Sequence, residues 1–378
     1  MNTTHTGSFT PKYRELYQWL ADRIYDGTYK YQQKLPSESA LCRQFSISRQ
    51  TVRNAMDQLE CDGFIIRSKG SGSFVSKRVR KKEKLIGVLF TTLGDYINSN
   101  ILTGLESIFT QHGYSMLLEQ SHNRIETETL FLEKMLNSKV SGLIIEGTKS
   151  SFPSPNEELY RRLSEMKIPY IFINNYFSNI SGPSVIWDDE KVSYLVTEQL
   201  IKSGHKKIAG LFRFDETQGP NRYLGYVKAL MDNHLPIQED YISWYCFSGQ
   251  PGEQKRQYQG VDLFVEDVLE NCTALICYND FIACHVVPYL TSRGVRIPDD
   301  LTVVSFDNSD ITKLYDSKQV PSIEHPKEKL GEMAARLLLR YIEDPTLDPT
   351  VSSRVKFPVL KEQEVTFERV LRFQTDDI

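Results

Sequence analysis

Residues 48–53, with the sequence SRQTVR, carry side chains that could read the base edges of duplex DNA. Arginine can donate two hydrogen bonds to guanine O6 and N7, and glutamine can pair with adenine. Arg49, Gln50 and Arg53 fall on the outward face near the start of a predicted helix, whose first residues would reach base edges in the major groove. A solvated helix face would explain these three residues equally well. The remaining polar side chains are short hydroxyls suited to phosphate oxygens, Ser48 and Thr51.

Two helices joined by a turn must position these side chains. The first helix is predicted over 37–44, with Ser37 as its N-cap, and a turn follows at 46–48. The second helix is predicted over 49–62, because its apolar residues recur with helical spacing and face inward. Gly63 would end this helix in a left-handed conformation.

A two-stranded ribbon follows the helices. Residues 64–66 and 73–75 are predicted strands around the tip 69–72, which is too rich in glycine to be core. Lys69, next to Gly70, could approach a DNA backbone or enter a minor groove from such a tip. The ribbon therefore favours DNA binding over a merely solvated helix face.

This region resembles the winged helix-turn-helix of the GntR family of bacterial transcription regulators. The family's pattern stands here as KLPSE at 34–38, F-x-x-SR-x-TVR-x-A at 45–55 and G-x-G-x-FV at 70–75, within a match over 11–76. Ser73 departs from the threonine that is commoner before FV. By position, the resemblance implies that Arg49 and Arg53 read bases and that Lys69 and Gly70 are wing contacts. It also implies phosphate or groove contacts at Lys12 and Tyr13, and positioning residues at Ser37, Glu38 and Thr51.

Length and composition limit the class of protein. A chain of 378 residues with 40% hydrophobic and 25% charged residues fits two or three globular domains. No apolar run approaches the ~20 residues of a membrane span, and residues 1–10 are polar, without a secretory signal. We therefore expect a disordered start and a cytoplasmic protein. The six cysteines form no CxxC pair, which favours reduced thiols over disulfides or a metal site.

The net charge of −4 hides a division along the chain. Residues 1–84 carry a net +8 and the remainder −12, as expected for a nucleic-acid module joined to a domain with another task. Residues 77–84 form a basic linker, either a solvated tether or a segment that touches phosphates.

From residue 85 onward, short apolar strands alternate with amphipathic helices. This pattern predicts parallel sheets covered on both faces, and its length predicts two lobes. Ligands bind outside the carboxyl ends of such strands. Polar or aromatic residues follow the predicted strands at 174–175, 187–189, 213, 278–280 and 307–308.

The second part resembles the LacI-type effector domain, which is similar to periplasmic sugar-binding proteins. The resemblance rests on VSGLIIEGT at 140–148, LIKSGHKKIAGL at 200–211, ALICYNDFIA at 274–283 and RIPDDLTVVSFDN at 296–308. The expected fold is thus multidomain, with an α+β winged helix-turn-helix before a two-lobed α/β domain at 85–372. The lobes are expected at about 85–187 with 325–354, and about 188–324 with 355–372.

The resemblance implies a homodimeric repressor that a small sugar releases from double-stranded operator DNA. FDETQGPNRYLGY at 214–226 and IEHPKEKLG at 323–331 fit an arabinose-responsive subgroup, so L-arabinose is the expected effector. Another pentose, a hexose or a phosphorylated sugar stays open, as does activation instead of repression. An enzyme is disfavoured because the sequence lacks the common nucleotide-binding, hydrolase and zinc-protease motifs.

A sugar site needs planar polar groups and an aromatic plate. Arg222 is the expected clamp on hydroxyl groups, with Asp307 as its carboxylate counterpart and Trp187 as the stacking plate, although a tryptophan here could equally be core. The other expected effector contacts are Tyr96, Asn123, Asn174, Asn279 and His325. We expect Asp280, and Asp188 or Asp189, only to cap the helices that follow them.

Overall fold

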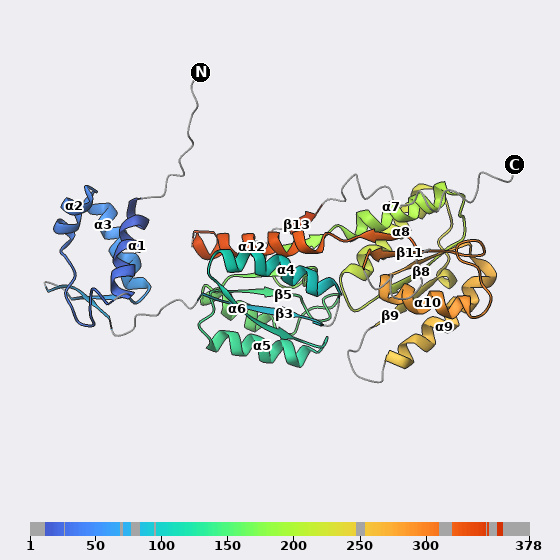
Figure 1. The fold of residues 1–378 in the computed structure, drawn as a ribbon, viewed down its shortest axis with the longest axis horizontal. Coiled ribbons are helices and arrows are strands. Elements are labelled where there is room, and N and C mark those ends of the chain that lie inside the picture. The colour runs from blue at the N-terminus through green and yellow to red at the C-terminus, as the bar shows by residue number, and fades with distance from the viewer. Residues whose placement is uncertain are drawn as a thin grey trace, which may run out of the picture. The chain divides into compact units, whose positions relative to one another are not determined.

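The computed structural model describes residues 12–25, 27–68, 71–76, 84–93, 96–246, 254–309, 320–344, 346–347 and 354–357. The chain divides into two compact units, Met1–Lys82 and Glu83–Ile378, which Figure 1 shows in blue and in green to red. The expectations for the disordered start, most of the basic linker and residues 358–372 lie outside the described residues. Among those residues, no helix has the length and apolar character needed to cross a membrane.

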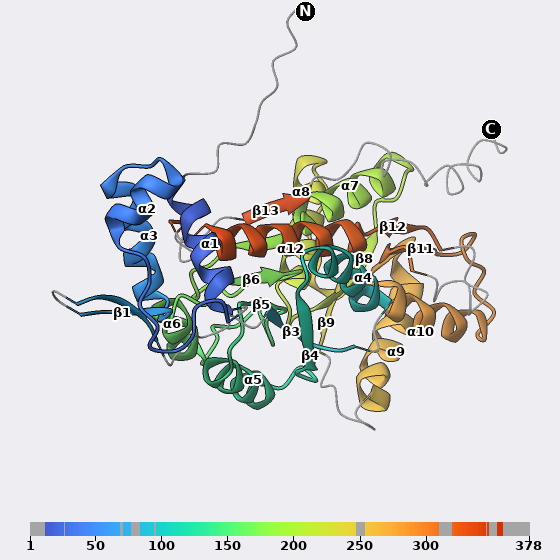
Figure 2. The same ribbon diagram turned by 60° about the vertical axis from the view of Figure 1, so that its left-hand side comes forward.

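The first unit is a three-helix core with a hairpin (Figure 2). Its elements are α1 (Lys12–Tyr25), α2 (Glu38–Phe45), α3 (Arg49–Cys61), β1 (Ile65–Ser68) and β2 (Gly72–Val75). β1 and β2 pair antiparallel, and the predicted helices begin within one residue of their expected positions. Gly63 has φ +74°, which is the left-handed conformation expected after the second helix. Leu16, Leu20, Leu41 and Val52 are fully buried, so apolar helical spacing does produce the core of this unit.

The first lobe of the second unit is a six-stranded parallel sheet. Its strand order is β13-β7-β6-β5-β3-β4. The strands are β3 (Leu85–Phe90), β4 (Ser115–Gln120), β5 (Gly142–Ile145), β6 (Tyr170–Ile173), β7 (Ser184–Trp187) and β13 (Arg354–Phe357). Helices α4 (Tyr96–Gln111) and α12 (Lys327–Glu343) pack against one face. Helices α5 (Ile125–Asn137) and α6 (Glu157–Glu165) pack against the other (Figure 1).

The second lobe is a five-stranded parallel sheet of order β12-β11-β10-β8-β9. The strands are β8 (Ile208–Arg213), β9 (Ile242–Tyr245), β10 (Ala274–Cys277), β11 (Thr302–Asp307) and β12 (Ser322–Glu324). Helices α7 (Asp189–Lys202) and α8 (Gln218–Asp232) cover one face. Helices α9 (Gln254–Asn271) and α10 (Asp280–Thr291) cover the other, and the short helix η1 (Glu239–Tyr241) precedes β9. Each lobe thus has its own core built on near-continuous apolar strands, as expected for a two-lobed α/β domain.

The last described strand corrects one expected lobe boundary. We expected the chain to enter the second lobe after residue 354, but β13 pairs with β7 in the first lobe from Arg354 to Phe357. Val355 lies opposite Val185 and packs on the apolar core of the first lobe. The strand stays in this lobe because it extends the ladder of β7 and buries an apolar side chain there.

Helices α4 and α12 approach each other through glycines. A Cβ on Gly104 would lie 2.1 Å from the carbonyl oxygen of Glu328, and one on Gly331 would lie 2.1 Å from that of Ile101. Gly104→Ala is therefore expected to lower the free energy of unfolding by ~1–3 kcal/mol or more, because the backbones must separate.

Gly260→Ala in α9 is the matched control for this substitution. A Cβ at Gly260 would meet nothing within 4 Å, so the higher helix propensity of alanine should raise stability by up to ~1 kcal/mol. Urea denaturation of both variants checks the pair. Equal midpoints would contradict the close backbone contact between α4 and α12.

Candidate functional site

The outward face of α3 presents the three expected base readers to solvent. Arg49, Gln50 and Arg53 are all exposed. Among the described residues, the Arg53 side chain has a single distant ion pair, with 3.9 Å between its Nη2 and Glu38 Oε2. The Gln50 amide donates to Asn54 Oδ1 at 2.9 Å, a bond that is easily exchanged on an exposed surface. The side chains are thus available for contacts outside the chain.

The expected hydroxyl residues hold the ends of the helices. Ser37 Oγ accepts from the Ala40 amide at 3.2 Å, which caps α2. Ser48 Oγ accepts from the Thr51 amide at 3.1 Å and lies 2.7 Å from Thr51 Oγ1, which caps α3. Each hydroxyl therefore orients a helix start.

The other expected DNA contacts lie at the edge of this unit or outside the described residues. Lys12 is exposed and Tyr13 half-buried at the start of α1. Lys69 and Gly70 lie outside the described residues, so the structure describes the two strands of the wing, β1 and β2, and not these two expected contacts.

The second unit contains a polar cavity at the carboxyl ends of strands from both sheets. Parallel α/β folds bind ligands at these ends, where loops diverge from the sheet. Fifteen residues line the cavity: Thr91, Thr92, Ile97, Asn98, Asn123, Glu146, Asn174, Arg213, Glu216, Gln218, Arg222, Tyr278, Asn279, Asp307 and His325. Six of the eight expected effector residues are among them: Asn123, Asn174, Arg222, Asn279, Asp307 and His325.

Arg222 of α8 is the centre of a buried charge network. Its Nε lies 2.8 Å from Asp189 Oδ1, its Nη2 lies 3.5 Å from Asp307 Oδ1, and its Nη1 donates to the Tyr278 carbonyl. Burial raises the pKa of Asp189 to about 6 and also raises the pKa of Asp307, while Arg222 opposes both shifts. Asp189 therefore neutralises a buried guanidinium, and our expectation that it only caps a helix is corrected. Asp188 is the N-cap residue of α7, but its side chain makes no capping hydrogen bond.

Tyr96 reaches this network from the first lobe. Its hydroxyl on α4 donates to Asp307 Oδ2 at 3.0 Å. Tyr96 does not line the cavity, so it holds a cavity residue in place from outside the wall.

Trp187 does not lie where a stacking plate would. It is 1% exposed within the core of the second lobe and does not line the cavity. The ring of His325 packs edge-on against it, with 4.8 Å between ring centroids, and His325 lines the cavity instead. Burial lowers the pKa of His325 well below its usual range, so this ring is neutral. Tyr278 is the other aromatic residue among the described residues that line the cavity.

Asn279, and not Asp280 as we expected, caps the helix that follows. Asn279 Oδ1 accepts from the Ile282 amide at 3.1 Å and caps α10, while the residue also lines the cavity. Asp280 is fully buried and accepts from the hydroxyls of Ser305, Ser309 and Ser322. Asp280 therefore holds β11 and β12 beside the start of α10, because its carboxylate accepts from hydroxyls on both strands.

Glu146, which the sequence reasoning missed, is the carboxylate of the first-lobe wall. It is 3% exposed and follows β5 directly. It accepts from the amide and hydroxyl of Thr91 at 2.7 and 2.6 Å, and from Asn174 Nδ2 at 2.9 Å. The rule that polar residues after strands form the site would have identified Glu146 as well.

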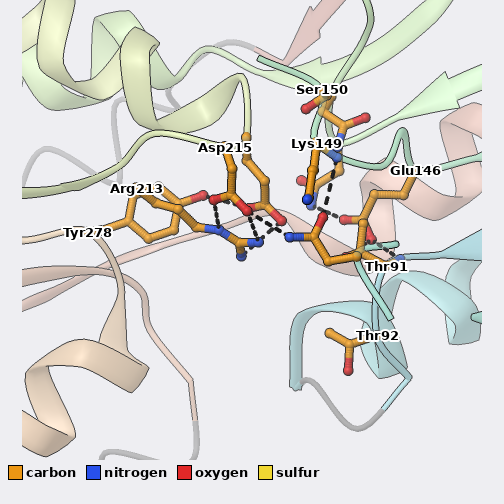
Figure 3. Close-up of polar contacts among 12 residues, drawn as sticks. Thr91, Thr92, Glu146, Lys149, Ser150, Arg213, Asp215 and Tyr278 are labelled. Carbon is orange, nitrogen blue, oxygen red and sulfur yellow. Dashed lines mark hydrogen bonds and ion pairs between the residues drawn. The ribbon is translucent and has the colours of Figure 1, made fainter. Parts of the chain in front are cut away.

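A second cluster of charges enters the cavity from the end of β8 (Figure 3). Arg213 Nε donates to Asp215 Oδ1 at 2.7 Å, and its Nη1 lies 2.9 Å from Glu216 Oε1. The Tyr278 hydroxyl donates to Glu216 Oε2 at 3.0 Å. Both cavity arginines are thus paired with two carboxylates each.

Comparisons with known proteins match both units. The model of bacterial regulatory proteins of the gntR family matches residues 12–75, and that of the periplasmic binding protein-like domain matches 197–359. The arabinose metabolism transcriptional repressor of Geobacillus stearothermophilus is 35% identical over 89% of this chain and 93% of its own length. That of Halalkalibacterium halodurans is 33% identical over 89% and 91%. The chain belongs to this family of bacterial transcriptional repressors.

A solved structure of a relative agrees with the fold. The transcription regulator CcpA of Lactococcus lactis is 26% identical, with a TM-score of 0.60 over 71% of this chain and 94% of its own. The repressor therefore combines a gntR-type DNA-binding unit with a LacI-like effector unit, as the sequence motifs indicated.

The cavity of the repressor offers buried polar atoms for a ligand. Asn98 Oδ1, Gln218 Oε1, Asp307 Oδ1 and His325 Nδ1 make no hydrogen bond within the described part of the chain. All four residues line the cavity and are less than 7% exposed. Buried polar atoms are normally satisfied, so these four are suited to hydroxyl groups of a bound molecule. The described residues contain no group of three metal-ligating side chains.

Glu216 should make the stability of the repressor depend on pH. Burial raises the pKa of Glu216 to about 8 from an ordinary 4.5, although Arg213 opposes the shift. The folded state then binds the proton more tightly than the unfolded state, so stability is lost as pH rises toward 8. Glu216→Gln should flatten the fall in urea midpoint between pH 6 and 8.5. The exposed Glu133→Gln should keep the wild-type slope, and an unchanged slope in Glu216→Gln would contradict the assignment.

Proposed function

We propose that this repressor binds operator DNA as a cytoplasmic homodimer and that its effector is L-arabinose. The observation that carries the sugar assignment is the set of four buried polar atoms around the cavity that make no hydrogen bond within the described part of the chain. A pentose can donate and accept hydrogen bonds around its whole rim, which matches a wall of amides, carboxylates and hydroxyls. The names of the two relatives that match most of the chain support arabinose among the sugars.

The charges of the cavity favour a neutral sugar over a phosphorylated one. Arg213 and Arg222 are both engaged by buried carboxylates, and His325 is neutral. An anion would have to displace a carboxylate from one of these pairs while facing Glu146 nearby. A buried charge without a partner is costly, so a sugar phosphate should bind far more weakly than the free sugar.

Release from DNA would follow from a linked equilibrium. Each of two DNA-binding units would place α3 in a major groove of a pseudo-palindromic operator. Sugar would favour closure of the lobes around the chain crossings after β7 and β12, and closure would change the spacing of the DNA-binding units. Reciprocity requires that operator weakens sugar binding by the same factor, typically worth ~1–3 kcal/mol.

Calorimetric titration with L-arabinose, with and without an operator duplex selected by the protein itself, tests this proposal. We expect binding of L-arabinose, weaker binding when operator is present, and little binding of L-arabinose phosphate. D-xylose, D-ribose and D-galactose serve as comparisons. Equal affinities with and without operator would defeat the coupling, and preference for the phosphate would defeat the neutral-sugar assignment.

A further inference from the structure

The segment 214–217, between β8 and α8, reaches from the second lobe to the first (Figure 3). Asn123 Nδ2, in the first lobe, donates to Asp215 Oδ2 at 2.6 Å. The Thr217 amide donates to Ser150 Oγ at 3.1 Å, and its hydroxyl donates to the Tyr176 carbonyl at 3.0 Å. Three hydrogen bonds thus join the lobes through one short segment.

An aromatic contact extends this junction toward solvent. Phe214 packs edge-on against Phe152 of the first lobe, with ring centroids 6.2 Å apart. The two residues are 38% and 46% exposed, although aromatic side chains of this size are usually buried. Neither ring is among the described members of the core clusters, so the contact between them lies outside the cores of both lobes.

The backbone on both sides is shaped for this contact. A Cβ at Gly219 would lie 1.5 Å from the Arg213 carbonyl oxygen, so the segment folds back tightly on β8 only because residue 219 is glycine. On the first lobe, Asn123 and Lys149 have φ of +55° and +52°, which L-residues rarely adopt. The backbone amide of Lys149 also donates to Asn123 Oδ1 at 3.3 Å. This bond orients the Asn123 side-chain amide that donates to Asp215. Such strained conformations persist only where the surrounding structure holds them.

Most of the junction lies outside the cavity lining, although Asn123 belongs to both. Phe152, Phe214, Thr217 and Ser150 do not line the cavity. Asp215 accepts a hydrogen bond from Asn123 of the first lobe and another from the guanidinium of Arg213, which lines the cavity.

We propose that Phe214, Asp215 and Thr217 form a latch that stabilises the closed lobes from outside the cavity lining, and so sets how much effector the repressor needs. Thr217 and Phe214 are its positioning residues. The inference rests on the proposed function, because it assumes that the sugar binds the closed lobes. Opening the lobes breaks every latch contact, since all of them join the two lobes. The apparent sugar affinity is the intrinsic affinity multiplied by the closed fraction, so a weaker latch lowers it.

Two substitutions weaken the latch while leaving the cavity lining intact. Thr217→Val removes the hydroxyl that bonds the Tyr176 carbonyl but keeps the side-chain shape, and Phe214→Ala removes the aromatic contact. Each should raise the dissociation constant for L-arabinose about fivefold in the full chain, the typical effect of one lost hydrogen bond or of one lost aromatic contact. Thr217→Ser keeps the hydroxyl and should restore nearly wild-type affinity.

Thr291→Val is the matched control in the same lobe. The hydroxyl of Thr291 also bonds a backbone carbonyl, that of Val287 at 2.8 Å, but within α10. Its loss should leave L-arabinose affinity unchanged. If Thr217→Ser is as impaired as Thr217→Val, or if Thr217→Val and Phe214→Ala both bind L-arabinose normally, the latch is refuted.

A distance measurement tests the latch without any sugar. Met166 after α6 and Met231 in α8 are 51% and 60% exposed and belong to different lobes. Nitroxide labels on unnatural residues at these two positions, diluted with unlabelled chain, report lobe separation by pulsed electron spin resonance. Phe214→Ala and Thr217→Val should shift the sugar-free distribution to longer distances, and an unchanged distribution would overturn the latch. If wild-type protein fails to bind L-arabinose, the proposed effector is wrong, while this measurement still decides the latch.

Discussion

Arg222→Ala is expected to abolish the response to L-arabinose while leaving operator binding intact. The substitution removes a hydrogen-bond donor from the cavity wall and leaves Asp189 and Asp307 buried without their cation. Removing one partner of a buried ion pair costs ~3–5 kcal/mol, so the second unit should also unfold at a lower temperature. Sugar affinity should fall more than ~100-fold, which corresponds to about 3 kcal/mol. Calorimetry, gel shift and thermal unfolding measure the three effects separately.

Two further variants separate stability from sugar binding. Adding Asp189→Asn to Arg222→Ala removes one of the stranded carboxylates, so stability should partly return while sugar binding stays lost. Lys228→Ala, on an exposed side chain of the same helix, should match wild type in both assays, since exposed ion pairs contribute little. Normal release of operator by Arg222→Ala would show that the cavity is not the effector site.

Arg53→Ala is expected to lower operator affinity by ~1–3 kcal/mol and to relax base preference at one operator position. Arg53 is exposed on α3 and its ion pair with Glu38 is long, so its guanidinium is available for a guanine. Sugar affinity should be unchanged, because the substitution lies in the first unit. Binding to the selected operator and to its single-base variants measures the effect.

Arg53→Lys distinguishes base recognition from simple charge. Lysine keeps the positive charge but lacks the planar fork that donates two parallel bonds to a base. It should therefore preserve binding to unrelated duplexes and their salt dependence, yet lose preference for the operator. If Arg53→Lys retained full operator preference, Arg53 would be a phosphate contact instead of a base reader.

The sequence motifs located the DNA-binding unit well because its organisation is local. Ser37 and Ser48 cap their helices within three residues of the amides they accept from. The apolar spacing of 52, 55, 56 and 59 corresponds to four buried side chains on one helix face. Such features depend on residues that are close in the sequence, so the spacing of residue types along the chain predicts them directly.

At the effector cavity, the sequence placed residues at the correct edge but did not assign their neighbours. The rule for strand ends brought Asn174, Asn279 and Asp307 to the cavity, and the resemblance to the LacI-type effector domain brought Arg222 there. The rule failed for Trp187, which faces the core of the second lobe, and it overlooked Glu146. Which way a side chain turns at the end of a strand depends on helices and strands from distant parts of the chain.

The sequence alone thus determined the class of protein: a helix-turn-helix unit before a two-lobed effector unit, each coded by local patterns and short motifs. Only the tertiary structure decided which polar groups are paired and which remain for a ligand. It also revealed the contact between Asn123 and Asp215, which stand 92 positions apart. The physical reason is that pairing of buried charges and contact between lobes arise from how two separate cores pack, and no local spacing records that packing.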